Sequence, residues 1–428
     1  MTAIVGILNK HGIAIAADSA ETIGNGIKIY NKANKIFNVS KYHPVGAAVY
    51  GNANFGDLTP WDIVFKLYRE NIGKLCLPKL EDYVNSFISF IEEKAFFAEA
   101  KELEDVFCNN ILAYFNEYII INRIGHGQTN AIDLTKLPLV LDEIKKEIEN
   151  ASVIDSIKDV TKEVFTASIE KALRQIKQIL AKNKYDYNSI EGKLIDVFYL
   201  AFTRKENMHN HSGIALFGYG KEEIYPTLFR LKIYGVVCGK LKWYIEEVCQ
   251  VTNSNNGFVC PMAQKDVMMT VLKGIEPRLQ QLIMNLTSQV IIENIKQIAA
   301  IAGKKNKQLA KDISSINIQP TLDLFNKNLN TLIDNNHVGP LISTIAILQK
   351  EDLAEVAENL IYLTSLIRRI TPDKESVGGP IDVALLSKGD GFIWIKRKHY
   401  FEETLNKNYF GKYYIDAIDK KEANNEQL

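Results

Sequence analysis

Hydrophobic and polar positions divide the chain into three groups of short strands, separated by two long helical blocks. Apolar runs at 3–8 and 12–17 flank the polar segment "NKHG", which predicts a tight hairpin. Neither run alternates with polar residues, and this is typical of strands that are covered on both faces. Two further strands are predicted at 35–40 and 45–50, the second ending at Gly51.

Helical periodicity begins after "LTPWD", where Thr59 is predicted to cap a helix and Pro60 to occupy its first position. Apolar residues then recur at three- and four-residue spacing through 97–208, and only "YIIINRIGHGQTN" interrupts the pattern. Within this block, 140–182 predicts a helix or helical hairpin with a solvated face. A second helical block covers 276–369, with polar breaks near "GKKNK" and "DNNHVGP".

The remaining apolar runs predict strands that pair as hairpins. They lie at 213–218, 226–235, 241–252, 381–387 and 392–398, and a short helix is predicted over 263–272. The last two runs are joined by "KGDG", whose Asp-Gly pair suits a hairpin turn. Because strands follow strands and helices follow helices, the pattern favours an α+β fold with antiparallel sheets.

Composition restricts the partners that we expect. The 428 residues can bury a large core, and 51 Lys+Arg balance 51 Asp+Glu. This balance removes the usual electrostatic reason to expect nucleic acid or an anionic membrane as a partner. No apolar stretch reaches the ~18 residues of a membrane span, and we see no signal peptide, so a cytoplasmic location is expected. The scattered cysteines fit reduced thiols better than a disulfide framework.

The N-terminus carries candidate chemistry. Thr2 directly follows the initiator methionine, and Asp18 closes the second apolar run. A threonine hydroxyl is a poor nucleophile unless a base takes its proton. Removal of Met1 would free the α-amino group of Thr2, whose ordinary pKa of about 7.7–8.0 lets it accept a proton near neutral pH. One residue would then supply both the nucleophile and the base.

The segments "TAIVGI", "GIAIAADSAET", "NKIFNVS" and "VGAAVYGNA" resemble the β-subunit of the proteasome family and related bacterial peptidase subunits, including the Anbu type. These proteins are N-terminal nucleophile (Ntn) hydrolases. The resemblance covers 2–56 and returns more weakly at "GIALFGYGKEEIYPTL" and "SVGGPIDVALLSKGDGFIWI". It implies a four-layer αββα sandwich of antiparallel sheets with two helical insertions. The implied division is core at 1–96, 209–275 and 341–415, insertions at 97–208 and 276–340, and a polar tail at 416–428.

The resemblance also implies a site. In the family, an Asp after the second strand and a Lys on the third strand keep the terminal amine neutral. Asp18 matches the first and Lys35 best matches the second, with Lys28 and Lys32 as rivals because the alignment slips in that loop. Gly51 matches the glycine whose backbone N–H forms the oxyanion hole. On residue type alone, Asp18 could be a turn residue, Lys35 a solvated edge lysine and Gly51 a strand exit.

The later polar positions of the family site match less well. Asp373 or Ser376 could serve, but Val377 stands where the family has a serine. A second family serine has only Ser254 as a candidate. These departures concern proton shuttling and leave the nucleophile in place.

The implied function is hydrolysis of a peptide or other amide bond through an acyl–Thr2 intermediate, with no metal or organic cofactor. One alternative is an inactive assembly or interaction protein that keeps the fold, and another is an amidase acting on a small molecule. Because members of the family form rings, a homo-oligomer is expected. Whether an unfoldase or adaptor delivers the substrate stays open.

Overall fold

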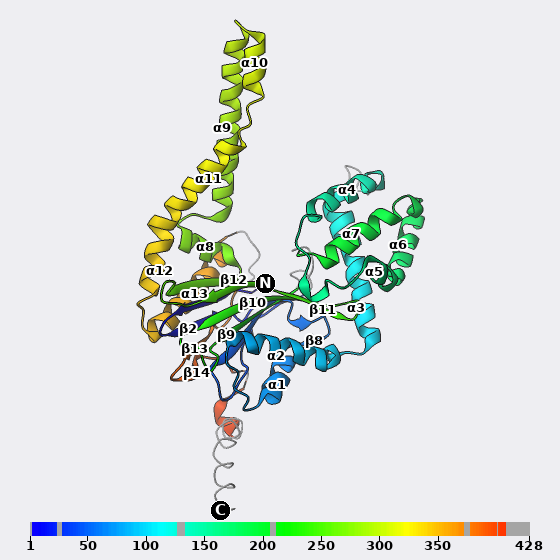
Figure 1. The fold of residues 1–428 in the computed structure, drawn as a ribbon. Coiled ribbons are helices and arrows are strands. Elements are labelled where there is room, and N and C mark those ends of the chain that lie inside the picture. The colour runs from blue at the N-terminus through cyan, green and yellow to red at the C-terminus, as the bar shows by residue number, and fades with distance from the viewer. Residues whose placement is uncertain are drawn as a thin grey trace, which may run out of the picture.

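The computed structural model describes residues 2–23, 28–125, 133–205, 211–371, 377–399 and 401–407. Its strands form two five-stranded sheets, and every pair of neighbouring strands is antiparallel (Figure 1). The first sheet has the order β12 (Gly257–Ala263), β1 (Ile4–Asn9), β2 (Gly12–Ala17), β13 (Asp382–Ser387) and β14 (Gly391–Lys396). The second has the order β11 (Lys240–Gln250), β10 (Thr227–Val237), β9 (Ser212–Gly218), β6 (Val45–Gly51) and β5 (Ile36–Asn38). The predicted combination of antiparallel sheets with separate helix groups is confirmed.

The two sheets pack face to face across a shared apolar layer. Leu8 and Ile15 of the first sheet belong to the same buried cluster as Phe217 and Leu228 of the second. Gly6 shows how closely the sheets approach, because a Cβ at this position would lie 3.0 Å from both Ile15 Cδ1 and Leu228 Cδ1. Burial on both sides explains why β1 and β2 are apolar at nearly every position.

Helices cover the outer face of each sheet. Helix α13 (Lys350–Ile370) lies on the first sheet, where Ala357 and Ile361 share a cluster with Val5. Helices α1 (Trp61–Ile72) and α2 (Leu80–Glu93) lie on the second sheet, and the stacked rings of Phe65 and Phe87 join them at 5.2 Å. Two small strand pairs add to this body: β3 (Glu21–Ile23) with β4 (Lys28–Tyr30), and β7 (Asn54–Phe55) with β8 (Thr59–Pro60).

The first helical block forms its own apolar cluster, in which Phe107, Phe165 and Phe198 are buried. Its helices are α3 (Ala100–Ala113), a π-helix at Tyr114–Ile124, α4 (Leu137–Ile148), α5 (Lys162–Ser168), α6 (Glu170–Lys182) and α7 (Glu191–Thr203). The predicted interruption at "YIIINRIGHGQTN" is helical as far as Ile124, and most of the rest lies outside the described residues. Short 3₁₀ turns occur at 95–97, 134–136, 155–157, 187–189 and 403–405.

The second helical block includes a long projection. Helices α9 (Pro277–Gly303), α10 (Lys307–Ser314) and α11 (Gln319–Ile333) extend away from the sheets (Figure 1). Helix α8 (Lys265–Lys273) precedes them, and α12 (Gly339–Ile345) leads back to the body. The chain breaks near "GKKNK" as predicted. The predicted break at "DNNHVGP" is wrong, because π-helical turns at Asp334–Val338 join α11 to α12.

Two other local predictions are corrected. Thr59 does not cap α1: Thr59 and Pro60 form β8, and the Thr59 hydroxyl donates to the Phe97 carbonyl at 3.2 Å. The sequence pattern also missed β12, which contains Pro261. Proline cannot donate to a strand ladder, and β12 tolerates it because it is an edge strand.

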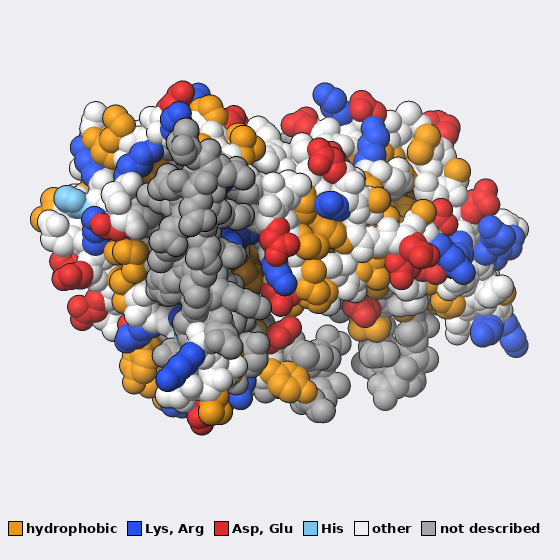
Figure 2. All heavy atoms as spheres, turned by 90° about the horizontal axis from the view of Figure 1, so that it is seen from below, with side chains coloured by type: hydrophobic (Ala, Val, Ile, Leu, Met, Phe, Trp, Pro, Cys, Tyr) orange, Lys and Arg blue, Asp and Glu red, His pale blue; other side chains and the backbone are white. Residues whose placement is uncertain are grey.

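The surface agrees with the balanced composition. On the face shown in Figure 2, basic and acidic side chains are interspersed rather than gathered into a patch of one sign. Over the described ranges, we find no helix that is both long enough and apolar enough to cross a bilayer.

Candidate functional site

The hairpin of β1 and β2 brings the N-terminus to Asp18. Ile4 pairs with Ala17 at the end of the hairpin, so the residues just outside it, Ala3 and Asp18, face each other. The Ala3 N–H donates to Asp18 Oδ1 at 2.9 Å, and the Asp18 N–H donates to the Ala3 carbonyl at 3.1 Å. Thr2 is half-buried and covalently adjacent to this double contact.

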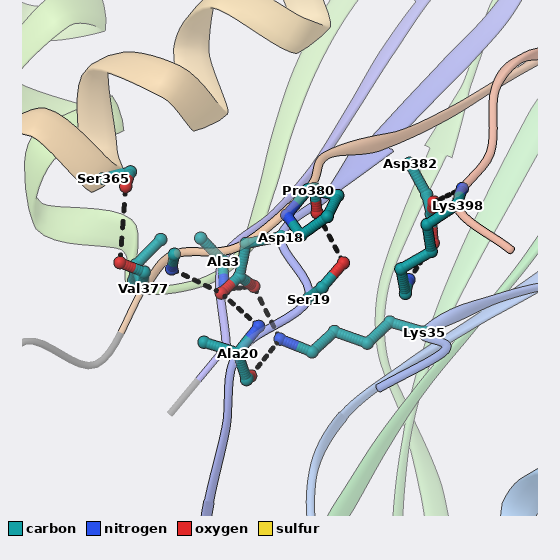
Figure 3. A network of polar contacts seen from close by, with 11 residues as sticks. Ala3, Asp18, Ser19, Ala20, Lys35, Ser365, Val377, Pro380, Asp382 and Lys398 are labelled. Carbon is teal, nitrogen blue, oxygen red and sulfur yellow. Dashed lines mark hydrogen bonds and ion pairs between the residues drawn. The ribbon is translucent and has the colours of Figure 1, made fainter. Parts of the chain in front are cut away.

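Lys35 reaches the same carboxylate from the other sheet (Figure 3). It immediately precedes β5, and its carbonyl accepts a hydrogen bond from the Val49 N–H of β6 at 2.9 Å. Its Nζ lies 2.6 Å from Asp18 Oδ1 and donates to the Ala20 carbonyl at 2.5 Å. The side chains of Lys35 and Asp18 are only 6% and 1% exposed, so this is a desolvated ion pair.

Backbone N–H groups complete the environment of the carboxylate. Asp18 Oδ2 accepts hydrogen bonds from Ala20 at 3.1 Å and Gly378 at 3.2 Å. Ser19 ties the same segments together, since its N–H donates to the Gly378 carbonyl and its hydroxyl donates to the Pro380 carbonyl. These partners were not predicted from the sequence, in which the "GG" dipeptide was the signal available for Gly378.

The electrostatics of the site centre on Lys35. Burial lowers the pKa of its ammonium group, while the adjacent Asp18 opposes this effect. The positive charge of Lys398 also lowers the pKa of Lys35. Lys398 is itself held in an ion pair with Asp382 of β13 (Figure 3). This second buried pair lies near the first and was not predicted from the sequence.

Gly51 lies on β6, the strand whose Val49 forms a backbone hydrogen bond with Lys35. It ends β6, two residues after Val49, and has φ +78°. A Cβ at Gly51 would lie 2.5 Å from the His211 carbonyl oxygen. Both the backbone conformation and the close approach therefore require glycine at this position.

Lys32 and Lys28 were the other lysines considered from the sequence. Lys32 is exposed. Lys28 belongs to β4, and its side chain lies outside the described part of the structure. Of the three lysines, the described contacts place Lys35 on Asp18.

Of the later candidates, Ser254 is described, and it is not brought to this pair. Ser254 is exposed in the loop between β11 and β12, and the adjacent Asn253 accepts a hydrogen bond from Lys10 at the β1–β2 turn. That turn is at the opposite end of β1 from Ala3. Asp373 and Ser376 lie outside the described residues. Val377 is buried with α13, and its carbonyl accepts a hydrogen bond from Ser365.

In the portion of the chain that is described, no group of three or more His, Cys, Asp or Glu side chains is placed so that it could bind a metal ion. What the arrangement offers instead is a buried ammonium–carboxylate pair, anchored beside the N-terminal residues and next to a strand that ends in glycine. Such a pair can influence the protonation of a neighbouring amine.

Comparisons with known proteins add little to this geometry. No family model and no curated protein matches the chain. Solved structures that are similar include an Anbu (Gly-1) mutant from Hyphomicrobium sp. strain MC1, at 10% identity and a TM-score of 0.30, covering 98% of this chain and 97% of that one. Anbu (ancestral beta-subunit) from Yersinia bercovieri has 10% identity, a TM-score of 0.26 and 97% coverage of both chains. These scores are low, so the proposal below rests on the residues of this chain.

Proposed function

We propose that this chain is a hydrolase whose nucleophile is its own second residue, Thr2, after removal of Met1. More particularly, we propose a proteasome-like threonine peptidase or amidase that cleaves a peptide or other amide bond. In this proposal, the two sheets and the helices on their outer faces are the αββα sandwich of an Ntn hydrolase.

One observation carries the proposal: Asp18 bonds both to Lys35 and to the residue that follows Thr2. Asp18 Oδ1 lies 2.6 Å from Lys35 Nζ and accepts a hydrogen bond from the Ala3 N–H at 2.9 Å. Cleavage after Met1 would therefore create a free amine on the residue next to Ala3, whose N–H bonds to the carboxylate of a desolvated ion pair. A positive charge near an amine lowers the pKa of that amine and favours its neutral, proton-accepting form.

In the proposed reaction, the Thr2 hydroxyl attacks the substrate carbonyl and its α-amino group takes the hydroxyl proton. Lys35 keeps that amine neutral, and Asp18 orients Lys35. The backbone N–H of Gly51 donates to the oxyanion as it forms, an interaction that can be worth a few kcal/mol of barrier. The amine then protonates the leaving nitrogen, and water hydrolyses the acyl–Thr2 ester to regenerate the enzyme.

The test has two stages. Intact-mass measurement on natively expressed protein should show a chain that begins at Thr2. A peptide epoxyketone, which reacts with both the hydroxyl and the free amine of an N-terminal threonine, should then add one equivalent of mass. Thr2→Ala is the matched control, because Met1 can still be removed before alanine while the hydroxyl is lost.

A chain that retains Met1, or a mature chain that resists the epoxyketone, would favour an inactive assembly protein. If the adduct forms, a panel of peptide and small amide substrates separates a peptidase from a small-molecule amidase. Asp373 and Ser376 stay candidates for proton shuttling, and alanine variants of each should then lower kcat without preventing removal of Met1.

A further inference from the structure

The projecting helix α9 leaves a row of large apolar side chains uncovered. Along its 27 residues, all of which the structure describes, Ala299 is the one buried residue. Four side chains spaced by three or four residues share its outer face: Leu279 is 49% exposed, Leu282 62%, Leu286 61% and Val290 53%. We call these four residues the α9 stripe. The opposite face of α9 is turned toward α11, and there Gln280 donates to Asn330 of α11 at 3.1 Å.

The surroundings of the α9 stripe are those of a protein interface. No charged residue occurs from 279 to 292, and the exposed residues beside the stripe include the amides Asn285 and Gln289. Charged residues are depleted at the centres of protein interfaces, and a helix with an uncovered apolar face ordinarily packs against a partner. From Leu279 to Val290 the stripe covers 12 residues, or roughly 16 Å of helix.

The charges at the two ends of the stripe indicate which partner fits. Arg278 lies eight positions before Leu286, and Glu293 lies seven positions after it. Both side chains are exposed. At 100° per residue, Glu293 lies about 20° and Arg278 about 80° from Leu286 around the helix, both on the same side of it, so Glu293 continues the line of the stripe and Arg278 lies at its flank. Two copies of α9 that cross antiparallel at Leu286 would therefore place each Arg278 beside the Glu293 of the other copy.

We propose that the α9 stripe is the contact surface for a second copy of this chain, with the two α9 helices antiparallel about a two-fold axis at Leu286. Under this symmetry Leu286 faces its own counterpart, Leu282 faces Val290, and the two Arg278–Glu293 pairs flank the apolar centre. A two-fold contact requires one surface to be complementary to itself, and this combination of an apolar centre with opposite charges at its ends meets that requirement. In each chain Glu293 already has Lys296 at 3.9 Å, an exposed contact that leaves room for Arg278.

The first test measures mass in solution for the full-length protein. Light scattering after size exclusion should show that the particle mass halves in the variant Leu282→Glu/Leu286→Glu, with an unchanged circular dichroism spectrum. Arg278→Glu and Glu293→Arg should each weaken association by about tenfold or more, and the double reversal should restore it. Lys311→Glu on α10 is the control, since it changes an exposed charge of the same projection away from the stripe.

A cross-linking test fixes the geometry. In Leu286→Cys the new thiols face each other, so mild oxidation with diamide should give a covalent dimer within minutes. Gln297→Cys, 11 residues further along α9, would place the two thiols roughly 33 Å apart and should not cross-link. The wild type, with its five native cysteines, is treated in parallel.

A monomeric wild type would overturn the proposal. So would an assembly whose mass survives the Leu282→Glu/Leu286→Glu change, because the stripe would then face another part of the protein or a different partner. Failure of the double charge reversal to restore association would refute the antiparallel register. None of these outcomes depends on whether Thr2 is a nucleophile.

Discussion

The most direct test of the site concerns the coupling between Asp18 and Lys35. We consider Asp18→Asn, Lys35→Met and the double variant. Asp18→Asn removes the negative charge and leaves a buried ammonium group with neutral acceptors, the new amide oxygen and the Ala20 carbonyl. Lys35→Met leaves a buried carboxylate that still accepts three backbone hydrogen bonds, from Ala3, Ala20 and Gly378.

The magnitude follows from burial. Both side chains are less than a tenth exposed, so removing one partner leaves a charge with little access to water. For buried pairs this typically lowers the free energy of unfolding by about 3–5 kcal/mol. The double variant has neither charge and should cost clearly less than the two single changes together. We expect the coupling energy to be about 2 kcal/mol or more.

Urea unfolding followed by tryptophan fluorescence is a suitable assay. The three tryptophans, Trp61, Trp243 and Trp394, lie in α1, β11 and β14, so the signal reports on the two-sheet body. The backbone of Trp243 also forms hydrogen bonds with Ser156 of the first helical block. Asp105→Asn is the matched control. It removes the same charge from the exposed Lys171–Asp105 ion pair, and we expect it to leave the unfolding midpoint unchanged.

Two results would refute this reasoning. If Asp18→Asn shifts the midpoint no more than Asp105→Asn does, the pair is not desolvated as the structure indicates. If the effects of Asp18→Asn and Lys35→Met simply add, the two side chains do not interact in solution, and the proposed role of Asp18 in orienting Lys35 fails with them.

Three further predictions follow from individual contacts. Trp61→Phe removes the buried hydrogen bond from Nε1 to Ser212 Oγ at 2.8 Å, and calorimetry should show a loss of about 1–3 kcal/mol. Gly51→Ala forces a Cβ to within 2.5 Å of the His211 carbonyl at φ +78°, so it should cost about 1–3 kcal/mol and lower kcat of the mature enzyme. The pKa of Lys35 is lowered, so between that folded-state pKa and 10.5 the folded protein binds fewer protons than the unfolded chain. Its contribution to stability should therefore rise with pH over that range, and Lys35→Met should flatten the rise in urea titrations at several pH values.

Much of the fold could be predicted from sequence because its central strands are unusually uniform. The strands β1, β2 and β13 are buried throughout, so they appear as continuous apolar runs between turn residues. Strand β12 lies at the edge of this sheet and pairs with β1 alone. Because it contains Pro261 and is at the edge, it does not appear as a continuous apolar run.

Helix ends were harder to predict because tertiary contacts compete with local signals. At Thr59 the capping pattern is present, yet Thr59 pairs with Phe55 of β7 as part of β8. Its hydroxyl donates to the carbonyl of Phe97, in the 3₁₀ turn that follows α2. At 334–338 the polar residues indicated a break, but they are solvent-facing turns of a continuous helix, in which Asn336 donates to the Leu332 carbonyl at 2.8 Å. Polarity there reflects exposure rather than a change of backbone.

The choice among Lys28, Lys32 and Lys35 shows where inference from a single sequence stops. Residue type cannot decide it, because all three are lysines within eight positions of one another. Among the described side chains, Lys35 reaches Asp18 because its carbonyl pairs with Val49 in the second sheet, which directs the side chain toward a carboxylate at the end of the first sheet. That selection depends on how the two sheets are packed, and no local pattern encodes it.

The surroundings of Asp18 leave even less trace in the sequence. Among the described residues, three of its four hydrogen-bond donors are backbone N–H groups, from Ala3, Ala20 and Gly378, and almost any residue could supply them. A carboxylate held in this way keeps its position whichever side chains surround it. It follows that substitutions at Ala3 or Ala20 should matter through their packing, whereas a proline at position 3 or 378 would remove a donor to Asp18 and loosen the contact with Lys35. The precision of the candidate site therefore depends on main-chain geometry, which residue-by-residue comparison does not detect.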